Sequence, residues 1–286
     1  MKCTSFSMKF LVFLFIMIIC FSIVVEADSV EKETPHIQDG VLNLKDWNFE
    51  QDGFIELKGT WDFYWNTFLG HTDLNDNNRK PDLKGEVPLV WNTYKKEGEN
   101  LPGFGYATYR TKVINAEVGI PLALRIPTMS TAYNIYVDDK MIASNGNATA
   151  DQSDFIPENK PVTAYIVPEN SEFNIIVHVA NYAYARGGMW YSIKMGTPNQ
   201  IQELMNNVIY TDLFLIGSFF ILGLYYLSIY LLRREDKASL YFVFICIVAI
   251  GRTMIHGDYA IYRVLPSIDF KMVVLLNYYT VYWAGT

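Results

Sequence analysis

Leu213–Leu232 reads LFLIGSFFILGLYYLSIYLL, twenty consecutive residues without a charged side chain. At a rise of 1.5 Å per residue, a helix of this length spans the roughly 30 Å hydrocarbon core of a bilayer. Arg233, Arg234 and Lys237 follow directly. Because cytoplasmic loops are enriched in Lys and Arg, we expect this turn to lie on the cytoplasmic side. The run therefore predicts a helix that crosses the membrane from outside to inside.

Two further apolar runs follow, Ala238–Ile255 and Met272–Gly285, separated by a loop over His256–Lys271. The sequence predicts a membrane region over 206–286, with helices at about 210–232, 238–255 and 271–286. The last run has only about fourteen apolar residues, fewer than the ~20 that a crossing needs. We therefore expect an incomplete third helix and an N-terminal fragment of a longer membrane protein. A re-entrant or interfacial end segment is the alternative.

Arg252 lies within the second predicted membrane helix. A charge at mid-bilayer costs about 2.5 kcal/mol or more, so such residues often carry function. We consider a role in coupling the membrane helices to the exported part. The alternative is that Arg252, near the outer end of its helix, extends its side chain to the interface at little cost.

The chain begins with the pattern of a secretory signal peptide over residues 1–27. Lys2 and Lys9 precede the uncharged run Phe10–Val25, and small residues stand at Val25 and Ala27. An uncleaved anchor is the alternative, although the run is short for a bilayer. If the domain after the signal peptide is exported, the helix at Leu213–Leu232 must run from outside to inside. The basic residues after Leu232 predict the same orientation.

Residues 28–205 have a different, polar composition. From Asp28 to Asn206 there are 15 Lys/Arg against 24 Asp/Glu, and the whole chain carries −7. This acidity argues against nucleic-acid binding, which needs a basic surface. The three cysteines, Cys3, Cys20 and Cys246, all lie outside this part. A secreted domain without cysteine fits a bacterial envelope protein, so we expect a bacterial cell membrane location with this domain outside.

The exported part is predicted to be all-β. Aromatic and β-branched residues alternate with period two between Gly, Pro, Asn and Asp, and no helical period separates them. Eight or nine strands of this kind favour a two-sheet β-sandwich or jelly roll. The predicted strands are Phe54–Leu57, Thr60–Trp65, Tyr106–Val113, Pro121–Ile126, Tyr133–Val137, Met141–Ser144, Val162–Val167, Phe173–Val179 and Trp190–Met195.

Several motifs, in order, resemble the extracellular domain of bacterial seven-transmembrane receptors with diverse intracellular signalling modules. They are Gly59–Trp65, Val87–Trp91, Gly103–Arg110, Ala132–Asp139, Ser144–Gly146, Asn181, Gly187-Gly188 and Gly223–Tyr226. The resemblance implies a galactose-binding-like jelly roll that binds a ligand. It also implies seven membrane helices and a cytoplasmic output domain. This sequence contains only three apolar runs after the exported part, and no output domain.

Motifs of enzyme chemistry are weak, so we expect no enzymatic activity in this chain and no cofactor. Gly103–Thr108 approaches a dinucleotide fingerprint but lacks its third glycine and precedes a strand. The four histidines show no metal-ligand spacing, and His178 alternates with apolar strand residues as a packed histidine would. Asp138-Asp139 is interpreted as a solvated hairpin turn, with a calcium site as the alternative.

The segment Asn181–Trp190 is the candidate ligand site. Tyr182, Tyr184 and Trp190 offer flat aromatic faces for a sugar ring, and Arg186 offers forked donors for its oxygens. The alternative is that Trp190 and one tyrosine belong to the core, and that Gly187-Gly188 merely turn the chain.

Two functions remain open at this point. The first is a sensor receptor whose exported domain binds a small molecule or carbohydrate and signals through the helices to an output domain. The second is a membrane-anchored carbohydrate-binding module without signalling. The expected partners are the lipid bilayer, an extracytoplasmic small molecule or carbohydrate, and a second copy of the chain paired through the missing region.

Overall fold

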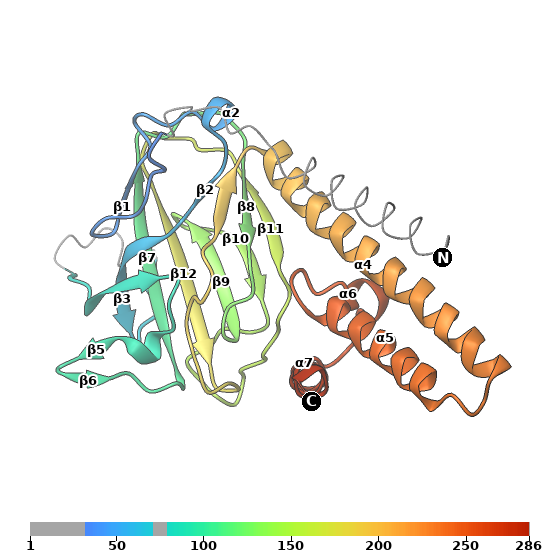
Figure 1. Cartoon of the computed structure of the whole chain (residues 1–286). Coiled ribbons are helices and arrows are strands. Elements are labelled where there is room, and N and C mark those ends of the chain that lie inside the picture. Colours follow the sequence, from blue (N-terminus) through green and yellow to red (C-terminus); the bar gives the residue numbers. More distant parts are fainter. Residues whose placement is uncertain (1–31, 71–78, 286) are drawn as a thin grey trace. The chain divides into compact units, whose positions relative to one another are not determined.

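The computed structural model describes residues 32–70 and 79–285 (Figure 1). The predicted signal peptide lies outside these residues. From Thr34 onward the chain packs as one unit. Its first part is mostly β-sheet and is followed by helices, as the alternation and the apolar runs predict.

The larger sheet has seven strands in the order β10-β9-β12-β7-β3-β4, and β1 pairs with β7 in parallel. Its centre is the antiparallel pair β12 and β7, in which Phe173 is opposite Val113 and Asn181 is opposite Gly105. The strands are β1 (Val41–Asn43), β3 (Gly59–Trp65), β4 (Leu83–Val87), β7 (Gly105–Ile114), β9 (Ala132–Val137), β10 (Lys140–Asn145) and β12 (Phe173–Asn181).

The smaller sheet has four strands in the order β11-β8-β13-β2. These are β2 (Ile55–Glu56), β8 (Leu122–Ile126), β11 (Val162–Ile166) and β13 (Lys194–Gly196). The short hairpin of β5 (Lys95–Lys96) and β6 (Glu99–Asn100) stands apart from both sheets. The one-turn helices α2 (Phe49–Asp52) and η1 (Trp91–Thr93) lie in connections.

Both sheets contribute to one hydrophobic core. Trp61, Phe63 and Tyr109 come from the larger sheet, Leu124 and Ile126 come from the smaller, and all five are fully buried. The rings of Phe63 and Tyr109 meet edge to face with centroids 4.9 Å apart. Alternating residues on facing sheets bury their apolar sides together, which is why the period-two pattern predicts this arrangement.

Strand β12 is buried on both faces. Phe173, Ile175, Val177 and Val179 enter the common core, as the alternation predicts. On the other face His178 is 8% exposed, and its Nε2 lies 3.0 Å from the backbone oxygen of Leu69. The prediction that His178 is a packed histidine is confirmed.

The strand predicted over Trp190–Met195 is wrong in its first half, because only Lys194–Gly196 forms a strand. The residues before it bond to separate segments: Met189 accepts from the Leu89 amide, and Ile193 accepts from the Leu57 amide. Strands β1, β4, β5 and β6 were not predicted from the sequence. These strands are short, and β4 (LKGEV) interrupts its alternation with Gly85.

Helix α4 spans Pro198–Leu232 and begins twelve residues before the predicted start at 210. The Thr197 side chain accepts from the Gln200 amide and the Gln200 side chain accepts from the Thr197 amide, a capping box that starts the helix at Pro198. Only Thr197 separates α4 from β13. The predicted boundary at 205/206 therefore falls inside a continuous helix.

Three helices follow α4. Helix α5 (Lys237–Ile255) and helix α7 (Phe270–Gly285) match the second and third apolar runs, and α6 (Ile261–Val264) lies within the predicted loop. Among the described residues, α4 and α5 are long and apolar enough to cross a membrane. Their large apolar side chains are exposed, Phe214 by 74% and Ile221 by 68%.

Candidate ligand site at the junction of the β domain and the helices

The loop 181–190 is fixed at its start by a buried asparagine. Asn181 Nδ2 donates to the backbone oxygens of Gly103 at 2.7 Å and Tyr184 at 2.6 Å. Its Oδ1 accepts from the Tyr184 amide and from the Thr131 hydroxyl, both at 3.1 Å. Because this buried side chain is fully bonded, it holds the loop in one path.

Gly187 and Gly188 give the loop its close packing. A Cβ at Gly187 would lie 2.2 Å from the Trp91 ring, and the Gly187 amide donates to Asn92 Oδ1 at 3.0 Å. Gly188 has φ of 106°, which favours glycine. These two residues therefore turn the chain and allow it to pack closely. This is the alternative that the sequence offered for Gly187-Gly188.

The four predicted ligand residues do not form one surface. The rings of Tyr184 and Trp190 lie together, with centroids 5.3 Å apart and planes tilted by 32°. Tyr182 points elsewhere, since its hydroxyl donates to the Ala150 backbone oxygen at 2.9 Å and its ring meets Phe155. Arg186 is exposed.

Tyr184 and Trp190 instead share a cavity with Arg252, the residue singled out in the second apolar run. This junction cavity, of about 310 Å³, is lined on one side by β-domain residues such as Thr128 and on the other by residues of α5 and α7. The Tyr184 hydroxyl bonds to the Tyr278 hydroxyl of α7 at 2.6 Å. The structure thus brings together two residues from the predicted loop and the predicted membrane arginine.

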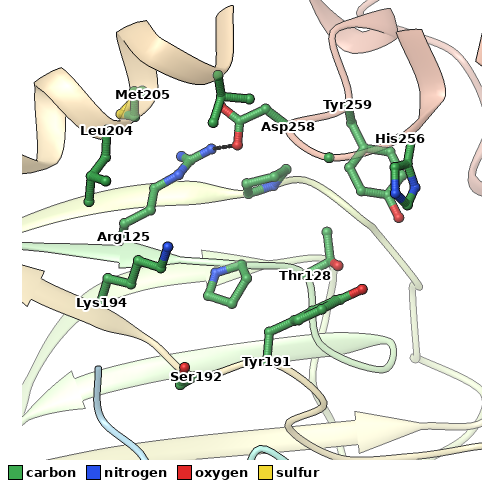
Figure 2. Close-up of a pocket in the computed structure, with 14 residues that line it drawn as sticks. Arg125, Thr128, Tyr191, Ser192, Lys194, Leu204, Met205, His256, Asp258 and Tyr259 are labelled. Atoms are coloured by element: carbon green, nitrogen blue, oxygen red, sulfur yellow. Dashed lines mark hydrogen bonds and ion pairs between the residues drawn. The ribbon is translucent and has the colours of Figure 1, made fainter. Parts of the chain in front are cut away.

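A second cavity, of about 360 Å³, adjoins the first and shares Thr128, Tyr191, His256 and Tyr259 with it. Figure 2 shows this second cavity, with Leu204 and Met205 of α4 on one wall and Tyr191 and Lys194 of the β domain on another.

Polar contacts join the β domain to the loop between α5 and α6. Arg125 of β8 forms an ion pair with Asp258, the dashed contact in Figure 2. Asn159 Nδ2 donates to the Tyr259 hydroxyl at 2.8 Å. The side chains of Arg125 and Asp258 are only 13% and 16% exposed. Breaking a shielded pair of this kind by removing one partner is unfavourable, because it leaves a charge without compensation.

Tyr184, which lines the junction cavity, and Tyr259, which lines both cavities, are neutral. Burial, strengthened by the hydrogen bond to Tyr278, raises the pKa of Tyr184 to about 12. Burial also raises the pKa of Tyr259. Both phenols therefore act at neutral pH as hydrogen-bonding groups and aromatic faces.

Sequence reasoning missed Arg125, Asn159, Asp258 and Tyr259. A usable signal was present in one case, because Arg125 is a charge inside the apolar strand Leu122–Ile126. The other three stand in polar loops, where nothing in the pattern marks a contact.

Asp138-Asp139 lies in the turn between β9 and β10. Asp138 stands at φ of 52° in the β9–β10 turn, and its Oδ1 accepts from the Asn174 amide at 2.8 Å. This bears out the interpretation as a hairpin turn. In the part of the chain that the structure describes, no group of three or more His, Cys, Asp or Glu side chains could hold a metal ion.

No family model and no curated protein matches this chain. Solved structures of bacterial enzymes match half of it. A GH2 beta-galacturonidase from Eisenbergiella tayi is 14% identical over 50% of this chain and 24% of its own, with a TM-score of 0.36. The beta-glucuronidase of Ruminococcus gnavus is 14% identical over 50% and 27%, with a TM-score of 0.38. The chain thus spans about a quarter of the length of these enzymes, and likeness of this degree says nothing about its activity.

Proposed function

We propose that this chain is the sensing part of a bacterial membrane receptor similar to the seven-transmembrane receptors with diverse signalling modules. Its β domain, a galactose-binding-like jelly roll, lies outside the cytoplasmic membrane and binds a small molecule, with carbohydrate as the first candidate class. Helices α4, α5 and α7 carry the change inward to an output domain. In this proposal the chain binds and transmits, and does no chemistry itself.

The observation that carries the proposal is the contact of the β domain with α7 and with the loop after α5. Arg125 pairs with Asp258, Asn159 bonds to Tyr259, and Tyr184 bonds to Tyr278. A ligand shifts a conformational equilibrium only if it interacts differently with the two states. A cavity lined by both parts supports the proposal, because a ligand there would lose or gain contacts if the β domain moved on the helices.

The aromatic pair favours carbohydrate within this proposal. Tyr184 and Trp190 both line the junction cavity, and their ring centroids lie 5.3 Å apart. The size of the cavity, about 310 Å³, lies at the lower end of the ~300–1,000 Å³ typical of small-molecule sites. Sugar rings stack their C–H faces on such side chains.

Spin labels in the full chain test transmission directly. In a background without native cysteines, in lipid nanodiscs, we would label Tyr165→Cys of the β domain and Val264→Cys of α6, both exposed. A panel of mono- and oligosaccharides is then added while the distance between the labels is measured. We expect a sugar that binds to change this distance. Binding with an unchanged distance would instead identify a membrane-anchored binding module.

A further inference from the structure

The junction cavity contains a permanent positive charge that has no carboxylate partner among the described residues. Arg252 lines it, whereas no Asp or Glu is among the described residues of its wall. Arg252 Nη1 donates to the side-chain oxygen of Asn277 and lies 3.4 Å from the Asn277 backbone oxygen, both neutral acceptors. None of the ion pairs between described residues includes it. Asp258, in the adjoining cavity, is already paired with Arg125.

A guanidinium presents five N–H donors in a planar fork that matches a carboxylate. The contacts to Asn277 use only one nitrogen, Nη1. Nε and Nη2 of Arg252 therefore retain donors for a ligand, and a partly buried charge favours an anionic partner.

A second unbonded donor lies just behind the same wall. Trp190 lines the cavity, and its indole N–H is buried with no hydrogen-bond partner among the described residues, so the ring must shift slightly for a ligand to reach it. Leaving a buried donor unbonded is unfavourable, so such groups call for an acceptor. Beside it, Tyr184 supplies an aromatic face 5.3 Å away between ring centroids.

We propose that the junction cavity binds a small carboxylate carried on a six-membered ring. The carboxylate pairs with Arg252, the ring lies against Tyr184 and Trp190, and a ring substituent or carboxylate oxygen accepts from the Trp190 indole. This inference rests on the proposed sensor function and names the class of ligand that the sensor recognises. The ring belongs either to an acidic sugar or to an aromatic acid, which share this chemistry.

The test compares matched probes on the full chain in lipid nanodiscs by calorimetric titration. Glucuronate is paired with glucose, and benzoate with benzyl alcohol, so that each pair differs in the carboxylate. We expect one acid to bind and its neutral counterpart to bind at least about tenfold more weakly, as the loss of a charge-assisted pair implies. The acid that binds identifies the source of the ring.

Variants then locate the site. Arg252→Gln should weaken binding of the acid about 10- to 100-fold, Arg252→Lys should restore part of it, and Trp190→Phe should weaken it while keeping the ring. Arg234→Gln, in the exposed turn after α4, is the matched control and should bind normally. If Arg252→Gln does not fold, Trp190→Phe with the probe pairs still tests the cavity.

Failures of the two proposals are distinguishable. Neutral glucose binding as tightly as glucuronate, unaffected by Arg252→Gln, would overturn the carboxylate site but leave a sugar sensor in place. An acid that binds through Arg252 without changing the spin-label distance would support the site and overturn the sensor. No binding by any of the four probes would overturn this inference, while the wider saccharide panel still tests the sensor.

Discussion

His178 is kept neutral by its surroundings. Burial lowers its pKa to about 4, against an ordinary value of 6.5, despite the opposing hydrogen bond to Leu69. Between these values the unfolded chain binds a proton that the folded chain does not, so the free energy of unfolding falls as pH is lowered from 6.5 towards 4. We expect a loss of about 3 kcal/mol over this window, read from denaturant unfolding at several pH values.

The variant His178→Gln supplies the control, because its amide can still bond to Leu69 but cannot titrate. Its unfolding free energy should depend less steeply on pH between 6.5 and 4 than that of the parent. Equal slopes in the two proteins would show that His178 takes up its proton in the folded state.

Gly187 leaves no room for a side chain. A Cβ there would lie 2.2 Å from the Trp91 ring, so Gly187→Ala must displace the ring or the loop, at a cost of about 1–3 kcal/mol. Thermal unfolding of the full chain measures this. Gly217→Ala in α4, where a Cβ meets nothing within 4 Å, should cause no loss. A stable Gly187→Ala protein would contradict the packing described for this loop.

At the level of residues, the sequence indicates which side chains are candidates for function more readily than it indicates which of them lie together in the fold. Tyr184, Trp190 and Arg252 could each be singled out because aromatic rings and a membrane arginine are unusual where they stand. Their shared cavity could not be predicted, because it depends on how a β loop meets two helices far away in sequence. In the sequence Tyr182 looks as good a candidate as Tyr184. Its ring nevertheless packs against Phe155, because the loop turns between Tyr182 and Tyr184.

At the level of elements, the ion pair between β8 and the α5–α6 loop should give a measurable interaction energy between Arg125 and Asp258. A double-mutant cycle with Arg125→Met and Asp258→Asn should give an interaction energy of about 1–3 kcal/mol. It is read from hydrogen exchange of the amides at 257–259, which should exchange faster in each single variant.

The pair Lys112–Glu172 is the matched control, with side chains 45% and 57% exposed. Its coupling should stay below about 1 kcal/mol, because solvent screens an exposed pair. A coupling at Arg125–Asp258 no larger than this would mean that the ion pair does not hold the loop on the β domain.

Elements with strong periodicity were predictable and those without it were not. The hairpin of β9 and β10 and the long strands β7 and β12 follow from alternation alone. Strand β4 could not be predicted in this way. Its buried position between Lys84 and Glu86 is a glycine, which carries no apolar side chain to mark the core face. Helix α4 was predicted from its apolar run, so its polar first part, begun by Thr197, was left out.

For the whole molecule, orientation in the membrane is the central prediction. Alkaline phosphatase fused after Gly196 should be active, because export places that junction outside. The same enzyme fused after Lys237 should be inactive, since the basic turn stays in the cytoplasm. A third fusion within 256–260 should be active again, on the side where this loop meets the β domain. Activity at the Lys237 junction would reverse the topology.

Because a single residue separates β13 from α4, a tilt of the strand would be passed directly to the helix. With 35 residues, α4 is about 52 Å long, so tilting its first turn by ~5° would displace its far end by ~4.5 Å. An adjustment at the β domain too small to disturb its core thus becomes, at Arg233 and Arg234, a displacement as large as a side chain. A Gly-Gly-Ser insertion between Gly196 and Thr197 leaves the capping box of α4 intact but makes its connection to β13 flexible. Labels at Tyr165 and Glu235 should then stop responding to a bound ligand.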